Sequence, residues 1–170
     1  RWSGARVVRP RDEALGTAHA RLLAEPRSRE AKVDFVTIYH MAMEGTLGMT
    51  TSHFLLDYLA EHELLPGFAE GYGLIAADEQ RHVAYGTEFL QRAVAEDGSM
   101  ADVVRARLHN LLPAMRETLS PPGIGAAEIL GIEESALAEH GLGALTRRMK
   151  LIDVELWGGF REDLPEPPDE

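Results

Sequence analysis

The sequence contains no cysteine. A disulfide framework and a thiolate metal site are therefore both excluded, and the absence fits a cytoplasmic protein. Basic residues are scarce as well: 17 Lys and Arg stand against 28 Asp and Glu, which gives a net charge of −11. Because no cluster of Lys or Arg reverses this balance locally, the composition argues against a nucleic-acid-binding surface.

Two long patterns are also missing. No apolar run approaches the roughly 18 residues of a membrane span, and no segment alternates as a β-strand does. The 170 residues are 45% hydrophobic and 26% charged, which is ordinary for a single globular domain. We therefore predict an all-α fold.

Proline, glycine and capping residues divide the chain into predicted helices. We expect helices over 11–25, from Ser28 as N-cap to about 62, from Pro66 to about 96, from Ser99 as N-cap to about 119, and over roughly 133–154. Pro113 should kink the fourth helix, and glycines at 141 and 143 weaken the last. A break at 121–123 and an acidic, proline-rich and disordered tail over 161–170 complete the expected organisation.

The helix that begins at Pro66 carries an unusual apolar face. At 100° per residue, Glu79 and His82 share one stripe with six apolar or small residues: Phe68, Gly71, Ile75, Gly86, Phe89 and Ala93. A buried carboxylate without a partner is costly or takes up a proton. A first-row transition metal would satisfy both groups, because side chains at i and i+3 point the same way. Glu-x-x-His alone is weak evidence, since it occurs often by chance.

The preceding helix contributes a second lone carboxylate. Residues 38–49 are apolar nearly all round, which is typical of a helix buried in its bundle, yet they include Glu44 with no basic residue three or four positions away. Only His40 can compensate Glu44 locally, so a His40–Glu44 core pair is the alternative interpretation. Two buried carboxylates and a histidine on consecutive helices favour a shared ion.

Helix geometry constrains this hypothesis. From Glu44 to residue 62 a helix rises about 27 Å, whereas Pro66 to Glu79 covers only about 20 Å at 1.5 Å per residue. If both groups reach one ion, the first helix cannot be straight. The small residues between 45 and 52 either bend the helix or form a π-bulge there, or they let a neighbouring helix approach closely.

A Glu on a buried helix, followed 35 positions later by Glu-x-x-His, resembles the second half of a ferritin-like dimetal-carboxylate bundle. Residues 78–86 (Asp-Glu-Gln-Arg-His-Val-Ala-Tyr-Gly) are similar to the small, metal-bearing subunit of class I ribonucleotide reductase. Tyr39, five residues before Glu44, is the feature shared with the ligand-binding oxidases of that group. The resemblance covers about 11–96 and implies a partial ferritin-like domain over 1–160 that continues into C-terminal helices.

The resemblance implies a role for each matching residue. Glu44, Glu79 and His82 would be metal ligands of a Mn/Fe or di-iron centre that activates O₂. Asp78 would accept a hydrogen bond from a ligating histidine. Tyr39 would be the catalytic tyrosine, which becomes ether-linked to a valine. In a regular helix Tyr39 lies 140° around from Glu44, so its ring would flank the site.

The same resemblance implies a homodimer and a bound long-chain fatty acid, for which Gly45 and Gly48 could leave room. The first Glu, the first Glu-x-x-His and the valine have no counterpart here, and the opening residues look like a mid-domain loop. We therefore expect an N-terminally truncated chain that is inactive alone.

Two other functions stay open. A radical-generating reductase subunit is the first, although the last tyrosine is Tyr85 and the acidic, proline-rich tail weighs against it. A non-enzymatic helical bundle is the second, in which the buried Glu and His side chains satisfy each other and no metal binds.

Overall fold

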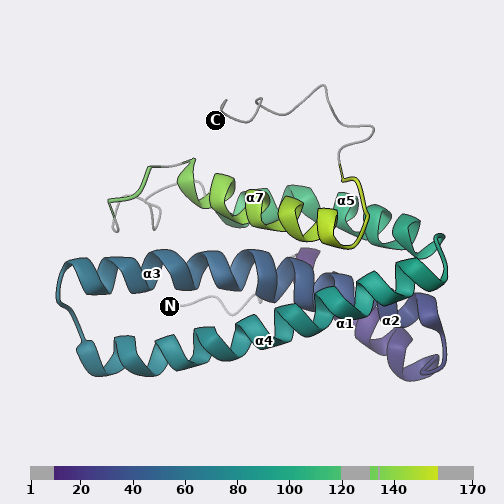
Figure 1. Ribbon diagram of the computed structural model, residues 1–170, viewed down its shortest axis with the longest axis horizontal. Coiled ribbons are helices and arrows are strands. Elements are labelled where there is room, and N and C mark those ends of the chain that lie inside the picture. Colours follow the sequence, from purple (N-terminus) through teal and green to yellow (C-terminus); the bar gives the residue numbers. More distant parts are fainter. Residues whose placement is uncertain (1–9, 120–130, 134, 157–170) are drawn as a thin grey trace, which may run out of the picture.

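The computed structural model describes residues 10–119, 131–133 and 135–156, and every regular element in them is a helix (Figure 1). The predicted all-α class is confirmed. The expected break at 121–123 and the tail over 161–170 lie outside the described residues, so the division into domains stays a prediction. In chain order the elements are α1 (Pro10–Ala24), α2 (Arg29–Val36), the π-helix η1 (Thr37–Gly48), α3 (Met49–Glu61), α4 (Pro66–Glu96), α5 (Met100–Leu119) and α7 (Ala136–Leu151).

The predicted long helix from Ser28 is present as three consecutive stretches: α2, η1 and α3. Ser28 caps it as expected, since its hydroxyl oxygen accepts a hydrogen bond from the Ala31 N–H at 3.2 Å. Glu63 and Leu65 then take left-handed backbone angles, with φ of 52° and 45°, and reverse the chain. Pro66 begins α4 at a position where its missing N–H costs no hydrogen bond. As a result, α4 runs back antiparallel to α3 (Figure 1).

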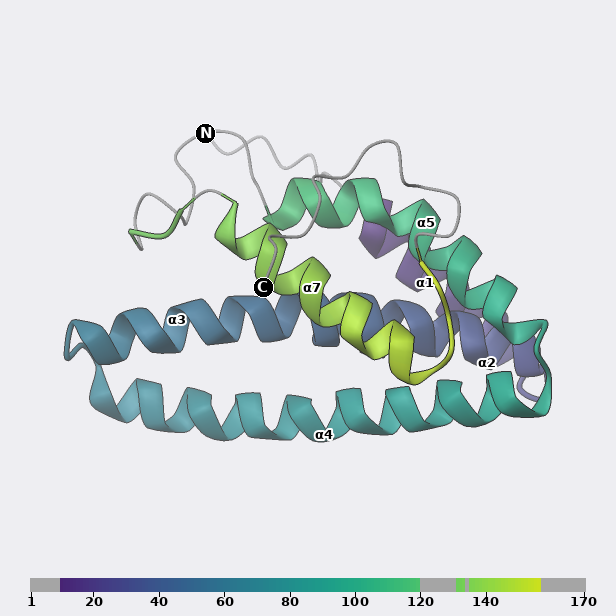
Figure 2. The ribbon, with the colours of Figure 1, turned by 45° about the horizontal axis from the view of Figure 1, so that its top comes forward.

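The helix η1 lies at the centre of the molecule and contacts α4, α5 and α7. In both ribbon views α4 lies at one edge of the structure, with α5 and α7 on the opposite side of η1 (Figures 1 and 2). The core between these helices is formed by fully buried side chains from four of them: Ile38, Met41, Leu90, Val104, Leu108, Leu145 and Met149.

The buried face of α4 differs from the predicted stripe. Its buried residues are Ala76, Val83, Gly86, Leu90 and Ala93. Of these, only Gly86 and Ala93 belong to the predicted stripe. Phe68 and Ile75 are instead 50% and 55% exposed. The reason is positional: no described helix covers the outer edge of α4 along its first half.

Ser99 and Gly141 have roles that differ from those predicted. Ser99 precedes α5 as expected, but its hydroxyl donates to the Asp97 carboxylate at 2.6 Å, so the side chain organises the preceding turn. Gly141 does not interrupt α7. A Cβ at Gly141 would lie 2.9 Å from Thr50 Oγ1, so this glycine lets α7 approach α3. None of the described helices combines the length and hydropathy needed to cross a bilayer.

Candidate metal centre

The residues around Glu44 form a twelve-residue π-helix, η1, that ends at Gly48. The expected distortion is therefore present, but it lies mostly before the small residues at 50–52, which belong to α3. In a π-helix hydrogen bonds join residues five apart. The Thr46 hydroxyl follows this spacing, since it donates to the Met41 carbonyl oxygen at 2.7 Å. Residues five apart in η1 thus lie nearly one above the other.

Gly45 is required by this geometry. A Cβ there would lie 2.7 Å from the carbonyl oxygen of His40 and 3.3 Å from Val83 Cγ1. The Gly45 carbonyl oxygen accepts a hydrogen bond from the Arg148 guanidinium of α7 at 2.7 Å, and burial lowers the pKa of Arg148. At Gly48 a Cβ would meet the carbonyl oxygen five residues earlier at 3.3 Å. Both glycines avoid a close contact between a Cβ and a carbonyl oxygen of η1. That they also leave room for a ligand stays a prediction.

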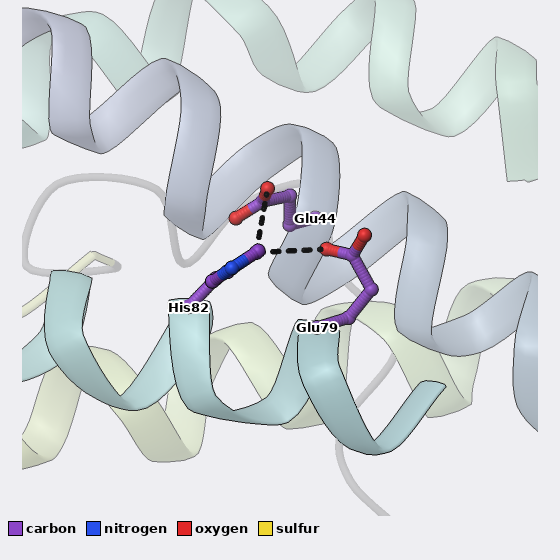
Figure 3. Close-up of side chains that lie close together, drawn as sticks. All are labelled: Glu44, Glu79 and His82. Carbon is purple, nitrogen blue, oxygen red and sulfur yellow. Dashed lines mark ion pairs between the residues drawn. The ribbon is translucent and has the colours of Figure 1, made fainter. Parts of the chain in front are cut away.

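The three predicted ligands lie together. Glu44 projects from η1 toward Glu79 and His82 of α4 (Figure 3). The His82 Nδ1 atom is 3.5 Å from Glu44 Oε1 and 3.8 Å from Glu79 Oε2. One ligand atom from each residue lies within 4.8 Å of the other two. The tertiary structure thus brings the Glu44 carboxylate to the Glu79 carboxylate and the His82 imidazole, which lie 35 and 38 positions later in the sequence.

Local helix geometry and one close contact produce this cluster. The i, i+3 spacing places Glu79 and His82 on the same side of α4. Gly86, one turn further on, lets α4 approach η1, because a Cβ there would lie only 2.4 Å from His40 Cβ. Any larger residue at this position would push α4, and with it both ligands, away from Glu44.

The donor atoms fit a transition-metal ion. The side chain of Glu44 is only 9% exposed, and Glu79 Oε2 is a buried oxygen with no hydrogen-bond partner among the described residues. An unpaired buried carboxylate oxygen is unfavourable unless a proton or a cation satisfies it. Carboxylate oxygens combined with imidazole nitrogen are the ligands of iron and manganese sites. The cluster therefore has the chemistry that such an ion needs.

His40 contacts this cluster through Glu44, as the alternative interpretation of the sequence predicted. Its Nδ1 atom lies 2.7 Å from Glu44 Oε2. Its ring contacts that of Tyr85 edge-on, at a centroid distance of 5.9 Å, and that of His82 at 6.5 Å. The available signal was the i, i+4 spacing to Glu44 on an otherwise apolar helix. The His40–Glu44 pair of the alternative interpretation is thus present, and it shares Glu44 with the candidate metal site.

Comparison with known proteins identifies the fold. No protein-family model matches the sequence. Among solved structures the chain is similar to an R2-like ligand-binding oxidase from Sulfolobus acidocaldarius, with a TM-score of 0.60 and 23% sequence identity. The chain has the fold of this oxidase. The match covers 82% of this chain and 50% of the oxidase, so the chain spans about half of its length.

This similarity confirms the predicted ferritin-like bundle. At 23% identity it establishes the architecture alone, and the chemistry of the site must be argued from its residues.

Tyr39 lies beside the cluster on η1. The Glu44 carboxylate, and to a lesser extent burial, raise the pKa of the Tyr39 phenol. The ring stacks on Phe35 at a centroid distance of 5.6 Å and remains 37% exposed. The expected angle of 140° between Tyr39 and Glu44 assumed a regular α-helix. Because η1 is a π-helix, the five-residue spacing brings the two side chains to the same side.

Asp78 is exposed and forms an ion pair with Arg81 on the surface of α4. It is not part of the cluster. Its expected histidine partner was placed outside this sequence, so its proposed role as a hydrogen-bond acceptor stays a prediction.

Proposed function

We propose that this chain forms half of a dimetal-carboxylate oxidase that activates O₂ at a Mn/Fe or di-iron centre. One observation carries the proposal: two carboxylates and a histidine converge in the fold of an R2-like oxidase, and a buried Glu79 oxygen has no hydrogen-bond partner among the described residues. When bound, such a centre supplies the redox chemistry of O₂ reduction. The chain spans half of that oxidase, so the described cluster represents half of the full ligand set.

The residues of the chain have distinct roles in this proposal. Glu44, Glu79 and the His82 Nδ1 atom would hold the metal. His40 orients Glu44, because it contacts the Glu44 oxygen that does not face His82. Tyr39 would be the residue oxidised, with the bound centre and O₂ supplying the oxidant. Its raised pKa reflects the adjacent Glu44 carboxylate, which would accept the phenolic proton as the electron leaves.

We extend the proposal to a long-chain fatty-acid-like ligand. In support, α4 and α7 border a groove of about 430 Å³ whose apolar lining comes from Met49, Val83, Ala84 and Leu151. Organic extraction of the purified chain followed by mass spectrometry would detect such a ligand. Recovery of no lipid from protein that contains the metal would contradict this part of the proposal.

Elemental analysis tests the metal centre directly. The chain is incubated anaerobically with Fe²⁺ or Mn²⁺, dialysed and analysed, beside Glu79→Gln and His82→Ala. A matched control is Glu88→Gln, which removes an exposed carboxylate of α4 that pairs with Arg92. We expect the parent and the control to retain metal and the two ligand variants to lose it. Equal metal contents in all four proteins, or none in the parent, would refute the proposal.

A non-enzymatic bundle is the second candidate, and the 2.7 Å contact between His40 and Glu44 favours it. In that case the buried carboxylate is satisfied by the protein itself. It predicts no retained metal and no O₂ consumption after Fe²⁺ is added in air. The oxidase proposal predicts that the chain retains metal and that this metal is lost in His82→Ala.

A further inference from the structure

The junction between η1 and α3 passes over one backbone carbonyl. In η1 hydrogen bonds join residues five apart, and the Met49 N–H follows this pattern by donating to the Glu44 carbonyl oxygen. The same N–H also donates to the Thr46 carbonyl oxygen, but not to that of Gly45. From Met49 onward the helix is α-helical, so the Thr50 N–H belongs to Thr46. The Gly45 carbonyl is therefore skipped where the two patterns meet.

The guanidinium of Arg148, on α7, occupies the vacated position. Its Nη1 atom donates to the Gly45 carbonyl oxygen at 2.7 Å. A Cβ at Gly45 would lie 3.4 Å from the same nitrogen, so the glycine leaves room for this approach. A buried carbonyl without a donor is costly. The hydrogen bond from Arg148 offsets that cost at the point where η1 ends.

Arg148 makes this contact instead of an ion pair. Its side chain is half-buried, and no carboxylate of the described residues forms an ion pair with it. Burial and, to a smaller extent, the neighbouring Arg147 lower its pKa. Arg107, by contrast, is paired with Asp34. A guanidinium placed here without an acid is unfavourable by itself, and the contact with the backbone of η1 is what it contributes in return.

The packing of α7 directs Arg148 to this carbonyl. Gly141 and Arg148 are seven residues apart and so share one face of α7, with the fully buried Leu145 between them. A Cβ at Gly141 would lie 2.9 Å from Thr50 Oγ1 and 3.4 Å from Thr46 Cγ2. This face of α7 therefore lies along the junction of η1 and α3, which explains how a residue 103 positions away reaches Gly45.

We propose that Arg148 is a positioning residue: its hydrogen bond to Gly45 holds η1 in the π form and thereby fixes the direction of Glu44. This inference rests on the proposed function, in which Glu44 is a metal ligand. Without the guanidinium, the Gly45 carbonyl accepts the Met49 N–H in the ordinary α-helical pattern. That change tightens the turn beside Glu44 and rotates its carboxylate away from the two ligands on α4.

Metal affinity of variants of the full 170-residue chain tests the consequence for the site. Arg148→Met retains an apolar side chain of similar length and removes the donors, whereas Arg148→Lys retains a charged donor. Arg147→Met is the matched control, because Arg147 is the exposed neighbour on the same helix. We expect the Mn²⁺ dissociation constant, measured from the electron paramagnetic resonance of free Mn²⁺, to rise at least about tenfold in Arg148→Met. The other two variants should bind Mn²⁺ like the parent.

A second measurement, without metal, reports the hydrogen-bond pattern itself. In isotope-labelled parent protein, nuclear magnetic resonance should detect a scalar coupling across the hydrogen bond from the Met49 nitrogen to the Glu44 carbonyl carbon. In Arg148→Met the coupling should run to the Gly45 carbonyl carbon instead. Circular dichroism verifies that each variant is folded. Arg148→Leu, which also lacks a donor and favours a helix, replaces Arg148→Met if that variant does not fold.

The two measurements distinguish this inference from the proposed function. A parent that binds no Mn²⁺ would refute the proposed function, while a coupling that moves in Arg148→Met would still support Arg148 as the residue that holds η1. A parent that binds Mn²⁺, with an Arg148→Met variant that keeps both the coupling to Glu44 and the affinity, would overturn the inference and leave the metal centre standing. Equal losses of affinity in Arg148→Met and Arg148→Lys would assign the effect to packing and also overturn it.

Discussion

Two buried carboxylates on the same long helix have very different surroundings. Asp34 of α2 is 4% exposed and receives two hydrogen bonds from the Arg107 guanidinium of α5, at 2.6 and 2.7 Å. Glu44, ten residues later, instead lies beside the imidazoles of His40 and His82 and the phenol of Tyr39. The first carboxylate is neutralised by a planar, permanently charged partner, in the bidentate geometry that arginine provides.

The difference separates a structural charge from a candidate functional one. The Asp34–Arg107 pair links α2 to α5, and each Asp34 oxygen accepts a hydrogen bond from the guanidinium. Neither oxygen is therefore free to bind a metal ion. Glu44 and Glu79 together have no arginine or lysine partner among the described residues, and one Glu79 oxygen has no hydrogen-bond partner among them. Two carboxylates without an arginine or lysine partner either bind a cation or incur the free-energy cost of burying an uncompensated charge. The following experiments test this contrast.

Breaking the Asp34–Arg107 pair should have the largest effect on stability. Arg107→Met leaves a buried, unpaired carboxylate, so we expect a loss of about 3 kcal/mol in the free energy of unfolding. Urea denaturation measures it, with Arg92→Met as the control because Arg92 pairs with Glu88 on the surface. The control should change by less than about 0.5 kcal/mol. Similar losses of unfolding free energy in both variants would show that the buried Asp34–Arg107 pair stabilises the protein no more than the surface pair does.

Separating α4 from η1 should have the next largest effect. Gly86→Ala forces a Cβ to within 2.4 Å of His40, so we expect a loss of about 2 kcal/mol from overpacking together with weaker metal retention. Gly73→Ala is the matched control on the same helix, where a Cβ meets nothing within 4 Å.

That control should gain about 0.5 kcal/mol, since alanine favours a helix over glycine. Thermal unfolding and elemental analysis of the two variants together provide the measurement. If both alanines stabilise the protein, the close contact at His40 does not hold α4 against η1.

Neutralising Glu79 should separate stability from metal binding. Glu79→Gln retains the shape of the side chain and removes a charge that has no arginine or lysine partner among the described residues, so the unfolding free energy without metal should change by no more than about 0.5 kcal/mol. Metal should nevertheless be lost. The test compares urea denaturation with and without Mn²⁺. A variant whose stability still rises on adding Mn²⁺, as in the parent, would place the ion elsewhere.

The smallest expected effect is on the titration of Tyr39. Its pKa is raised above the ordinary value of 10.0, mainly by the Glu44 carboxylate, so the neutral phenol is favoured in the folded state. This preference stabilises the folded state at pH values below the Tyr39 pKa of the unfolded chain. The stabilisation is lost as the pH rises through the Tyr39 pKa of the folded state. We expect Glu44→Gln to lower the pKa of Tyr39.

Tyrosinate absorbance during an alkaline titration follows this change, and Tyr39→Phe identifies the transition that belongs to Tyr39. An unchanged titration in Glu44→Gln would show that Tyr39 does not sense this carboxylate.

Much of the architecture followed from the amino-acid sequence, because its signals are local. The cap at Ser28 and the proline at 66 mark helix ends through hydrogen bonding and backbone angles within a few residues. The i, i+3 spacing of Glu79 and His82, and an uncompensated Glu44 on an apolar helix, were enough to predict the cluster. Even the need for a distorted helix followed from the rise per residue.

The tertiary structure decided what depends on neighbours distant in sequence. Arg107 as the partner of Asp34, and Arg148 as the donor to Gly45, come from helices 73 and 103 positions away, which no periodicity connects. The exposed edge of α4 was predicted as buried, because a stripe shows that a face is apolar and not whether anything covers it. Tyr39 reaches the side of Glu44 because the π-helix brings residues five apart together, whereas His40, four residues before Glu44, reaches it through the ordinary i, i+4 spacing.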